Sequence, residues 1–436
     1  MSDNKKTNPI IKNWLILLLS YLVALHICYQ GLNSLGKNRT DEWSELAATT
    51  QAKALVEGKR KYGIPTILAE THYPMGSIYI LSFLIRSGIS NEKILRLFPF
   101  TIAILILLMS ITLYSMSNLT FRIKFLALTS TLLIYHSPGV LNWMGALHEH
   151  SYSLSISLLL LLISIFSNKN ISLFLFLIGF FSSWIGYDFL PINIISTFSL
   201  RLLVYSIGER QKKIDSFLFS LKDTGWLVSG IGWAILLHLF QNAFYFNSLT
   251  HAVKDLIGVA GGRMNLPWIY ETLNPIYHAK LKNLMMNEQI ANHRLLIFLN
   301  LLKSFIMDGW IYKKTLFSLA LLLVFWWWIV GQEYKKNYMT PNLAKNEVCI
   351  FIGLTLLSSM AWSFLMPWHT IFHFHFLPRH FFIIILTFFY SLTVFDISYP
   401  SFKHNNKKQL AVFFSFQAMP FLLIFYCYIH TLNHPN

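Results

Sequence analysis

Acidic, histidine and arginine residues form small groups in this sequence, and the first two groups could supply a general base. Asp41 and Glu42 are adjacent carboxylates in the stretch TDEWSELAATTQAKALVEG. His148, Glu149 and His150 follow one another directly. A carboxylate or an imidazole that is partly removed from water is suited to accept a proton from a reacting hydroxyl group. Both groups are therefore candidates for acid–base chemistry.

The third group lies in the segment WHTIFHFHFLPRHFF, which contains Arg379 and His380. An arginine is permanently charged and can bond two oxygens of one phosphate, so we expect this segment to bind an anion. His369 and His373 have the i, i+4 spacing of metal ligands on a helix. No carboxylate is near them in the sequence, and histidines at a membrane interface are the commoner explanation.

Each group also has a structural explanation, which stays open. Asp41 would cap the helix that follows, and Glu42 would complement the dipole of that helix. The residues from His148 to His150 would form an exposed first helical turn. Asp188, in the motif GYDFLP, would cap a loop or orient a basic side chain.

Apolar helices must position these groups. Only 12% of the 436 residues are charged, and the mean hydropathy is +0.50. About eleven segments are long enough to cross roughly 30 Å of hydrocarbon as helices, and no alternating pattern indicates a barrel. The fold class that we predict is an all-α polytopic membrane protein.

Charge and cysteine content exclude other classes of protein. The net charge is +16, but cytoplasmic loops of membrane proteins carry excess Lys and Arg, so we expect no nucleic-acid partner. The three cysteines show no paired spacing, so neither a disulfide framework nor a zinc site is predicted.

We interpret residues 1–436 as one domain of a bacterial plasma membrane, with its N-terminus in the cytoplasm. Its predicted parts are a first, uncleaved span at 14–32, a first outer loop with juxtamembrane helices at 33–97, a helical bundle at 98–240, a large outer loop at 241–314 and C-terminal spans at 315–430.

Three segments carry more detailed expectations. The residues after Asp41 are expected to form a short helix that ends at Gly58. The segment 73–88 is too short to cross a bilayer, so we place it as an interfacial or re-entrant helix. The basic segment 201–223 is expected to be a cytoplasmic loop.

The order of these features resembles a known family. The motif DEWSELAATTQAKALVEGK, then YP before a short apolar segment with Tyr79, then GISNEKILRLFPF before a span, is similar to the lipid-linked-sugar glycosyltransferases of the GT-C superfamily. The nearest look-alikes are the protein O-mannosyltransferases and the transferases that attach aminoarabinose to lipid A. The resemblance covers residues 14–190, is faint afterwards and returns at 366–382.

The resemblance implies a GT-C-like bundle and a reaction. A sugar would move from a polyprenyl-phosphate donor to an acceptor hydroxyl of a glycan, lipid or protein at the outer membrane face. The catalytic aspartate of the family falls on Asp41, and the acidic residue of its second outer loop falls on Glu149. No cofactor is expected, with a divalent metal as the alternative, because the nearest look-alikes work without metal whereas the oligosaccharyltransferase branch uses one.

The predicted site combines these matches with the groups described above. Asp41 would take the proton of the acceptor hydroxyl as its oxygen attacks the sugar C1 opposite the phosphate, which inverts that carbon. The residues predicted to bind substrate are Glu42, Glu149, His148, Tyr79 and Asp188. The residues predicted to bind the lipid phosphate are Arg379, His380, Arg96 and Arg263.

Two other functions remain as alternatives. A flippase or transporter of lipid-linked sugars would show polar or broken helices at mid-membrane. The predicted spans are instead cleanly apolar, and the ionisable groups gather on outer loops, which favours surface chemistry. A membrane protease or transpeptidase would need an outer Ser or Cys nucleophile with a base, and none is evident.

Overall fold

The structure, a computed structural model, is helical wherever it is described. It describes residues 9–35, 42–58, 75–117, 119–167, 171–187, 189–208, 212–264, 266, 293–307, 318–328, 341–372 and 377–395. Within these ranges there is no strand, so the predicted all-α fold is confirmed.

The helices have the following bounds. They are α1 Pro9–Ser34, α2 Glu42–Val56, α3 Gly76–Arg86, α4 Glu92–Met116, α5 Phe121–His136, α6 Pro138–Met144, α7 His150–Phe166, α8 Ser172–Ile185, α9 Leu190–Leu203, the π-helix η1 Val204–Gly208, α10 Lys213–Phe246, α11 Leu249–Arg263, α15 Arg294–Met307, a helix at Ser318–Trp328, α17 Pro341–Leu365, α18 Pro367–Phe372, the 3₁₀ turn η2 Leu377–Arg379 and α19 His380–Phe395.

Among the described residues, five helices are long and apolar enough to cross a membrane. They cover Trp14–Ser34, Glu92–Met116, Leu190–Ile207, Lys213–Phe244 and Val348–Leu365. The chain is therefore consistent with a helical membrane protein, as predicted.

The predicted number of about eleven spans is not confirmed. The apolar helices α7, α8 and α19 contain 17, 14 and 16 residues. At 1.5 Å per residue they reach roughly 21 to 26 Å, which is shorter than the roughly 30 Å of a hydrocarbon core. The last predicted span, within 410–430, lies outside the described residues.

Local sequence signals fix the first helices as expected. Gly58 has a φ of +71°, a conformation that glycine adopts without steric cost, and it follows the end of α2 at Val56. Helix α4 begins after Asn91, whose Oδ1 accepts hydrogen bonds from the backbone N–H groups of Lys93 (2.9 Å) and Ile94 (3.4 Å). The short helix predicted within 73–88 is α3.

Helix α10 corrects the prediction of a loop at 201–223, because it begins at Lys213 and runs for 34 residues. Its first turns bury polar Ser216 and Ser220 and expose apolar Phe217 and Leu221. A loop was predicted because the segment is rich in charge. The inverted pattern, polar inside and apolar outside, is that of a helix that faces lipid.

Helices α8 and α10 pack backbone to backbone. A Cβ atom on Gly179 would collide with the carbonyl oxygen of Leu227, and one on Gly230 would collide with the carbonyl oxygen of Phe176. Only glycine permits this approach, and small residues serve this purpose between membrane helices. The pair therefore forms a closely fitted unit.

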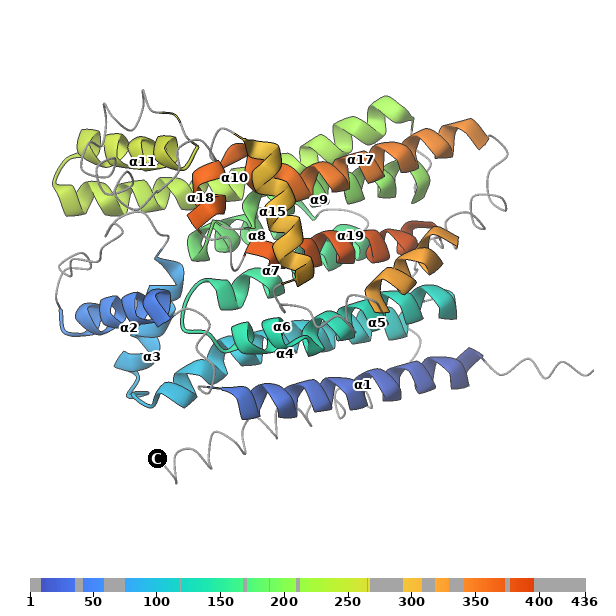
Figure 1. Ribbon diagram of the computed structural model, residues 1–436, viewed down its shortest axis with the longest axis horizontal. Coiled ribbons are helices and arrows are strands. Elements are labelled where there is room, and N and C mark those ends of the chain that lie inside the picture. The colour runs from blue at the N-terminus through green and yellow to red at the C-terminus, as the bar shows by residue number, and fades with distance from the viewer. Residues whose placement is uncertain are drawn as a thin grey trace, which may run out of the picture.

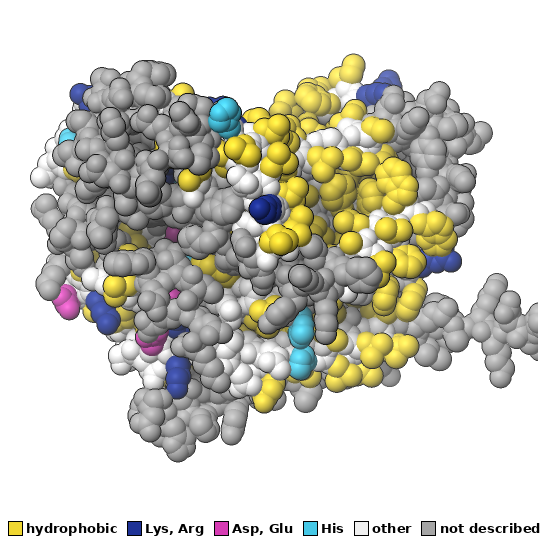
Figure 2. All heavy atoms as spheres, viewed as in Figure 1, with side chains coloured by type: hydrophobic (Ala, Val, Ile, Leu, Met, Phe, Trp, Pro, Cys, Tyr) yellow, Lys and Arg dark blue, Asp and Glu magenta, His cyan; other side chains and the backbone are white. Residues whose placement is uncertain are grey.

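The long helices lie roughly side by side, and α2, α3 and α11 gather at one end, on the left of Figure 1. We call this the α2 end. The C-termini of α1, α8, α10 and α17 and the N-termini of α4, α7, α9 and α19 point toward it. In Figure 2 hydrophobic side chains spread over the opposite part of the visible face, while the acidic side chains in view lie at the α2 end.

Candidate functional site

The group His148–Glu149–His150 lies where the chain enters α7, at the α2 end. His148 is fully buried, His150 is 5% exposed, and Glu149 is half-buried. One ligand-type atom from each residue lies within 4.8 Å of the others, and the two imidazole rings are perpendicular with centroids 4.5 Å apart. The first turn of α7 therefore gathers three ionisable groups in a place with little water.

Arg379 joins this group from a distant part of the sequence. Its NH2 atom lies 2.5 Å from Nδ1 of His150, and its guanidinium lies over the rings of Trp143 (4.6 Å) and Phe189 (5.4 Å). Arginine has no acceptor atom, so Nδ1 of His150 must accept and the neutral ring carries its proton on Nε2. These contacts hold a cation beside a neutral imidazole and aromatic faces.

The hydrogen bonds of the two imidazoles bear on metal binding. Nδ1 of His148 accepts from the backbone N–H of His150 at 3.2 Å, as Nδ1 of His150 accepts from Arg379. In the neutral form both rings then carry their protons on Nε2. A metal ion needs a ring nitrogen with a free lone pair, so it would have to displace one of these bonds. The described arrangement suits an anion better than a metal.

Aromatic and imidazole rings surround His380, the first residue of α19. Its ring lies edge-on to Phe189 (4.5 Å between centroids) and faces Trp362 of α17 (6.4 Å). His369 of α18 also contacts Trp362, at 5.1 Å. His373 lies outside the described residues. The segment that carries Arg379 is thus packed against the rings of Phe189, directly before α9, and Trp362 of α17.

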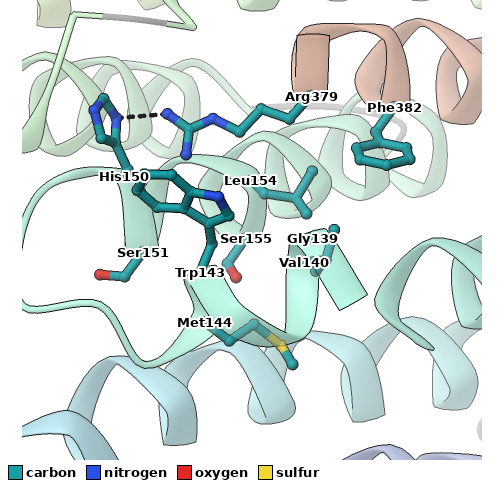
Figure 3. A pocket seen from close by; sticks show the side chains of 10 residues that line it. All are labelled: Gly139, Val140, Trp143, Met144, His150, Ser151, Leu154, Ser155, Arg379 and Phe382. Carbon is teal, nitrogen blue, oxygen red and sulfur yellow. Dashed lines mark hydrogen bonds between the residues drawn. The ribbon is translucent and has the colours of Figure 1, made fainter. Parts of the chain in front are cut away.

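A small pocket, with room for about one water molecule, lies beside His150 and Arg379 (Figure 3). The Arg379 side chain and the Trp143 indole lie at one side of it, and Phe382, Leu154 and Met144 line the rest with apolar groups. The hydroxyls of Ser151 and Ser155 on α7 and the residues Gly139 and Val140 of α6 complete the lining. A cation at the edge of an apolar pocket suits a ligand with an anionic group and a hydrocarbon part.

A buried ion pair ties α2 to the same region. Arg96 of α4 donates from NH1 and NH2 to the two carboxylate oxygens of Glu45, both at 2.7 Å, and also bonds Glu92 and the carbonyl of Gly145. Glu45 in turn accepts from the backbone N–H of Leu147 at 3.1 Å. This cluster, the Glu45–Arg96 clamp, holds the first turns of α2 beside the residue that precedes His148.

The clamp bears on the predicted role of Arg96. Two carboxylates compensate its charge, and Arg96 and Glu45 are 4% and 3% exposed, so its contacts favour a structural role. Binding of a lipid phosphate by Arg96 stays a prediction. The i, i+4 spacing of Glu92 and Arg96 could have indicated one half of the clamp. No pattern in the sequence indicated that Glu45 pairs with Arg96.

Tyr79 and Arg263 also lie at the α2 end. Tyr79 of α3 accepts a 3.4 Å hydrogen bond from Nε2 of Gln241 and stacks on Trp184, with centroids 6.4 Å apart. Arg263 ends α11 near Tyr187: burial raises the pKa of Tyr187, and the charge of Arg263 partly opposes that rise. Neither residue is among those that line the pocket beside Arg379.

The remaining predicted residues are less fully placed. Asp41 and Asp188 lie outside the described residues, so their assigned roles stay predictions. Glu42 is the first residue of α2, but its side chain is not described. The clamp through Glu45 does place the start of α2 close to the chain that carries His148.

Comparison of the chain with models of known protein families, with curated proteins and with solved structures found no match. The geometry of the α2 end is therefore the main guide to function.

Proposed function

We propose that this protein is an inverting glycosyltransferase that moves a sugar from a polyprenyl-phosphate donor to an acceptor hydroxyl at the outer face of a membrane. The five long apolar helices in the described part of the chain suit a protein that meets its lipid donor in the bilayer. The ionisable groups at the α2 end suit chemistry at the membrane surface.

One observation carries the proposal: Arg379 meets His150 at the edge of an apolar pocket although 229 residues separate them in the chain. A polyprenyl phosphate has an anionic group attached to a hydrocarbon chain. Arg379 would bind the phosphate beside His150, which also lines the pocket. The apolar side chains around Arg379 would pack against the first part of the lipid.

The reaction then needs a base and a stabilised leaving group. The acceptor oxygen attacks C1 of the sugar and loses its proton to Asp41, while the bond between C1 and the phosphate oxygen breaks. The polyprenyl phosphate leaves with one more negative charge, which Arg379 stabilises because that charge develops in the transition state. Glu149 and Glu42 would orient hydroxyl groups of the sugar or the acceptor.

The test is transfer by the purified protein in nanodiscs from radiolabelled undecaprenyl-phosphate hexoses to water, glycan and peptide acceptors. We expect Asp41→Asn to lower turnover by about 10² to 10⁴, the usual contribution of a general base, with donor binding retained. Asp215→Asn, at the opposite end on α10, is the matched control and should keep full turnover. Transfer that survives Asp41→Asn would contradict the role of Asp41.

A second assay separates the flippase alternative from the enzyme. In sealed proteoliposomes a flippase would move intact labelled lipid across the bilayer and leave the bond between sugar and phosphate unbroken. Lipid movement without any release of labelled sugar would overturn the proposed transferase.

A further inference from the structure

Helix α10 carries a polar stripe near its C-terminal end, in which His238 and Asn242 are buried and Gln241 is half-buried. His238, Gln241 and Asn242 are spaced i, i+3 and i+4, so they lie on one face of the helix. His238 is 2% exposed, Asn242 is fully buried, and a 3.3 Å hydrogen bond joins the two side chains. Polar and ionisable side chains inside an apolar helix are costly, which makes this stripe a candidate binding site.

Residues from two other elements face the stripe. The ring of Tyr187, in the loop after α8, lies edge-on to His238 with centroids 6.3 Å apart. On the other side Tyr79 accepts from Gln241 and stacks nearly parallel to Trp184, with 11° between the ring planes. An imidazole, two amides, two phenols and an indole thus converge between α3, α8 and α10.

Two of these groups have unused hydrogen-bonding capacity. Among the described residues, the hydroxyl of Tyr187 and Oε1 of Gln241 are buried atoms with no hydrogen-bond partner. A buried polar atom without a partner loses its hydration and gains nothing in return, at a cost of about 1 to 3 kcal/mol. A ligand that bonds both atoms would recover that loss.

The cluster is next to Glu149, which is proposed to orient the substrate. Gly186 directly precedes Tyr187, and a Cβ atom on Gly186 would lie 3.1 Å from Cβ and Cγ of Glu149. The loop that carries Tyr187 therefore packs on Glu149, while Arg379 approaches the same short segment through His150. The stripe, through the loop with Tyr187, and the pocket beside Arg379 are thus both close to this segment.

We infer that Tyr79, Trp184, Tyr187 and the α10 stripe form a subsite for a sugar ring, which rests on the proposed function. Phenol, amide and imidazole groups are mixed donors and acceptors that match sugar hydroxyls, and an aromatic face matches the C–H face of the ring. The same chemistry fits the hexose of the donor and the sugar of a glycan acceptor, so the test has one arm for each source.

The donor arm compares two lipids in nanodiscs by thermophoresis: undecaprenyl phosphate, and undecaprenyl phosphate that carries glucose, mannose or galactose. The Kd of undecaprenyl phosphate divided by the Kd of the sugar-carrying lipid measures how much the sugar contributes to affinity. Each of Tyr187→Phe and Gln241→Met should lower that ratio about two- to tenfold, as expected for one lost hydrogen bond, and should leave binding of the sugar-free lipid unchanged.

The acceptor arm uses saturation-transfer NMR with methyl glucoside, methyl mannoside and methyl galactoside on protein loaded with undecaprenyl phosphate. A signal that falls in both variants assigns the subsite to the acceptor, whereas a change in the donor arm alone assigns it to the donor hexose. If the variants change neither arm, the subsite is overturned. Both arms measure binding, so their outcome does not depend on whether the protein transfers the sugar.

A fold control keeps the result interpretable. The Tyr187 hydroxyl has no partner among the described residues, so Tyr187→Phe should leave the unfolding temperature unchanged or higher. Tyr29→Phe removes a hydroxyl from a tyrosine of α1 that is 55% exposed, and it should change neither arm. An equal loss of sugar binding in Tyr29→Phe would also overturn the subsite.

Discussion

Arg201 and Arg379 are both buried, one at each end of the bundle, but their contacts differ in kind. Nε of Arg201 bonds the Asp223 carboxylate at 2.7 Å, and its other donors reach Tyr205 and the carbonyls of Ser164 and Ser167. Arg379 instead contacts His150 and the faces of aromatic rings.

The difference separates a structural arginine from a candidate functional one. A carboxylate neutralises Arg201 and backbone carbonyls use its remaining donors, so this site ties α9 to α7 and α10. The described contacts of Arg379 are instead an imidazole and aromatic faces, and a small pocket lies beside it. Burial alone therefore does not identify function, whereas the chemistry of the contacts does.

The largest expected effect breaks the structural site. Arg201→Met leaves the Asp223 carboxylate buried without its cation, so we expect a loss of about 3 to 5 kcal/mol in the free energy of unfolding. Denaturant titration in detergent measures this loss. The double variant Arg201→Met/Asp223→Leu should recover most of it, and no recovery would show that the charge is not the cause.

The next effect tests the Glu45–Arg96 clamp. Glu45→Gln keeps the shape of the side chain but weakens its bonds to Arg96, so we expect a loss of about 1.5 to 3 kcal/mol in unfolding free energy. Glu92→Gln is the matched control because the Glu92 side chain is 47% exposed. It should cost less than about 1 kcal/mol. Equal losses would show that the exposed Glu92 carboxylate contributes as much to stability as the buried Glu45 carboxylate.

A smaller effect concerns Arg379. Arg379→Lys keeps the charge but loses the planar fork that binds two phosphate oxygens, so affinity for undecaprenyl phosphate should fall about tenfold, or 1.4 kcal/mol. Thermophoresis in nanodiscs measures the Kd. Arg201→Lys should leave that Kd unchanged, and the contrast between the two arginines fails if both variants weaken binding equally.

The smallest effect concerns Gly186. Its backbone is extended, so alanine fits the local conformation, and the new methyl group would press on Glu149 at 3.1 Å. We expect at most about 1 kcal/mol of destabilisation, measured by thermal unfolding. Gly186→Ala should lower turnover even though it changes the free energy of unfolding only slightly. Unchanged turnover would show that the position of Glu149 does not matter.

The sequence predicted local features well because they depend on neighbouring residues. Helix α2, its end near Gly58 and the short α3 follow from caps, glycine and apolar length. The sequence indicated His148–Glu149–His150 and the segment with Arg379 as separate candidate groups. It did not indicate that the two groups lie together. Residues 229 positions apart meet only through tertiary packing.

Other residues were missed because they lie within apolar helices. All three of Asp223, His238 and Gln241 occur in α10, but the sequence predicted a loop up to Asp223, an ordinary span that includes His238, and an outer loop that begins at Gln241. Their buried face is visible only once the lipid-facing side of the helix is known. The partner of Arg96 was missed for a related reason, because Glu45 lies on a different helix.

The close fit of α8 against α10 has a mechanical consequence. Because the two backbones touch at Gly179 and Gly230, neither helix can shift without moving the other, and the loop with Tyr187 is attached directly to α8. A single methyl group added at Gly230, which is buried against α8, would therefore push α8 and α10 apart. The resulting shift of α8 would move the loop that carries Tyr187, where a sugar is proposed to bind.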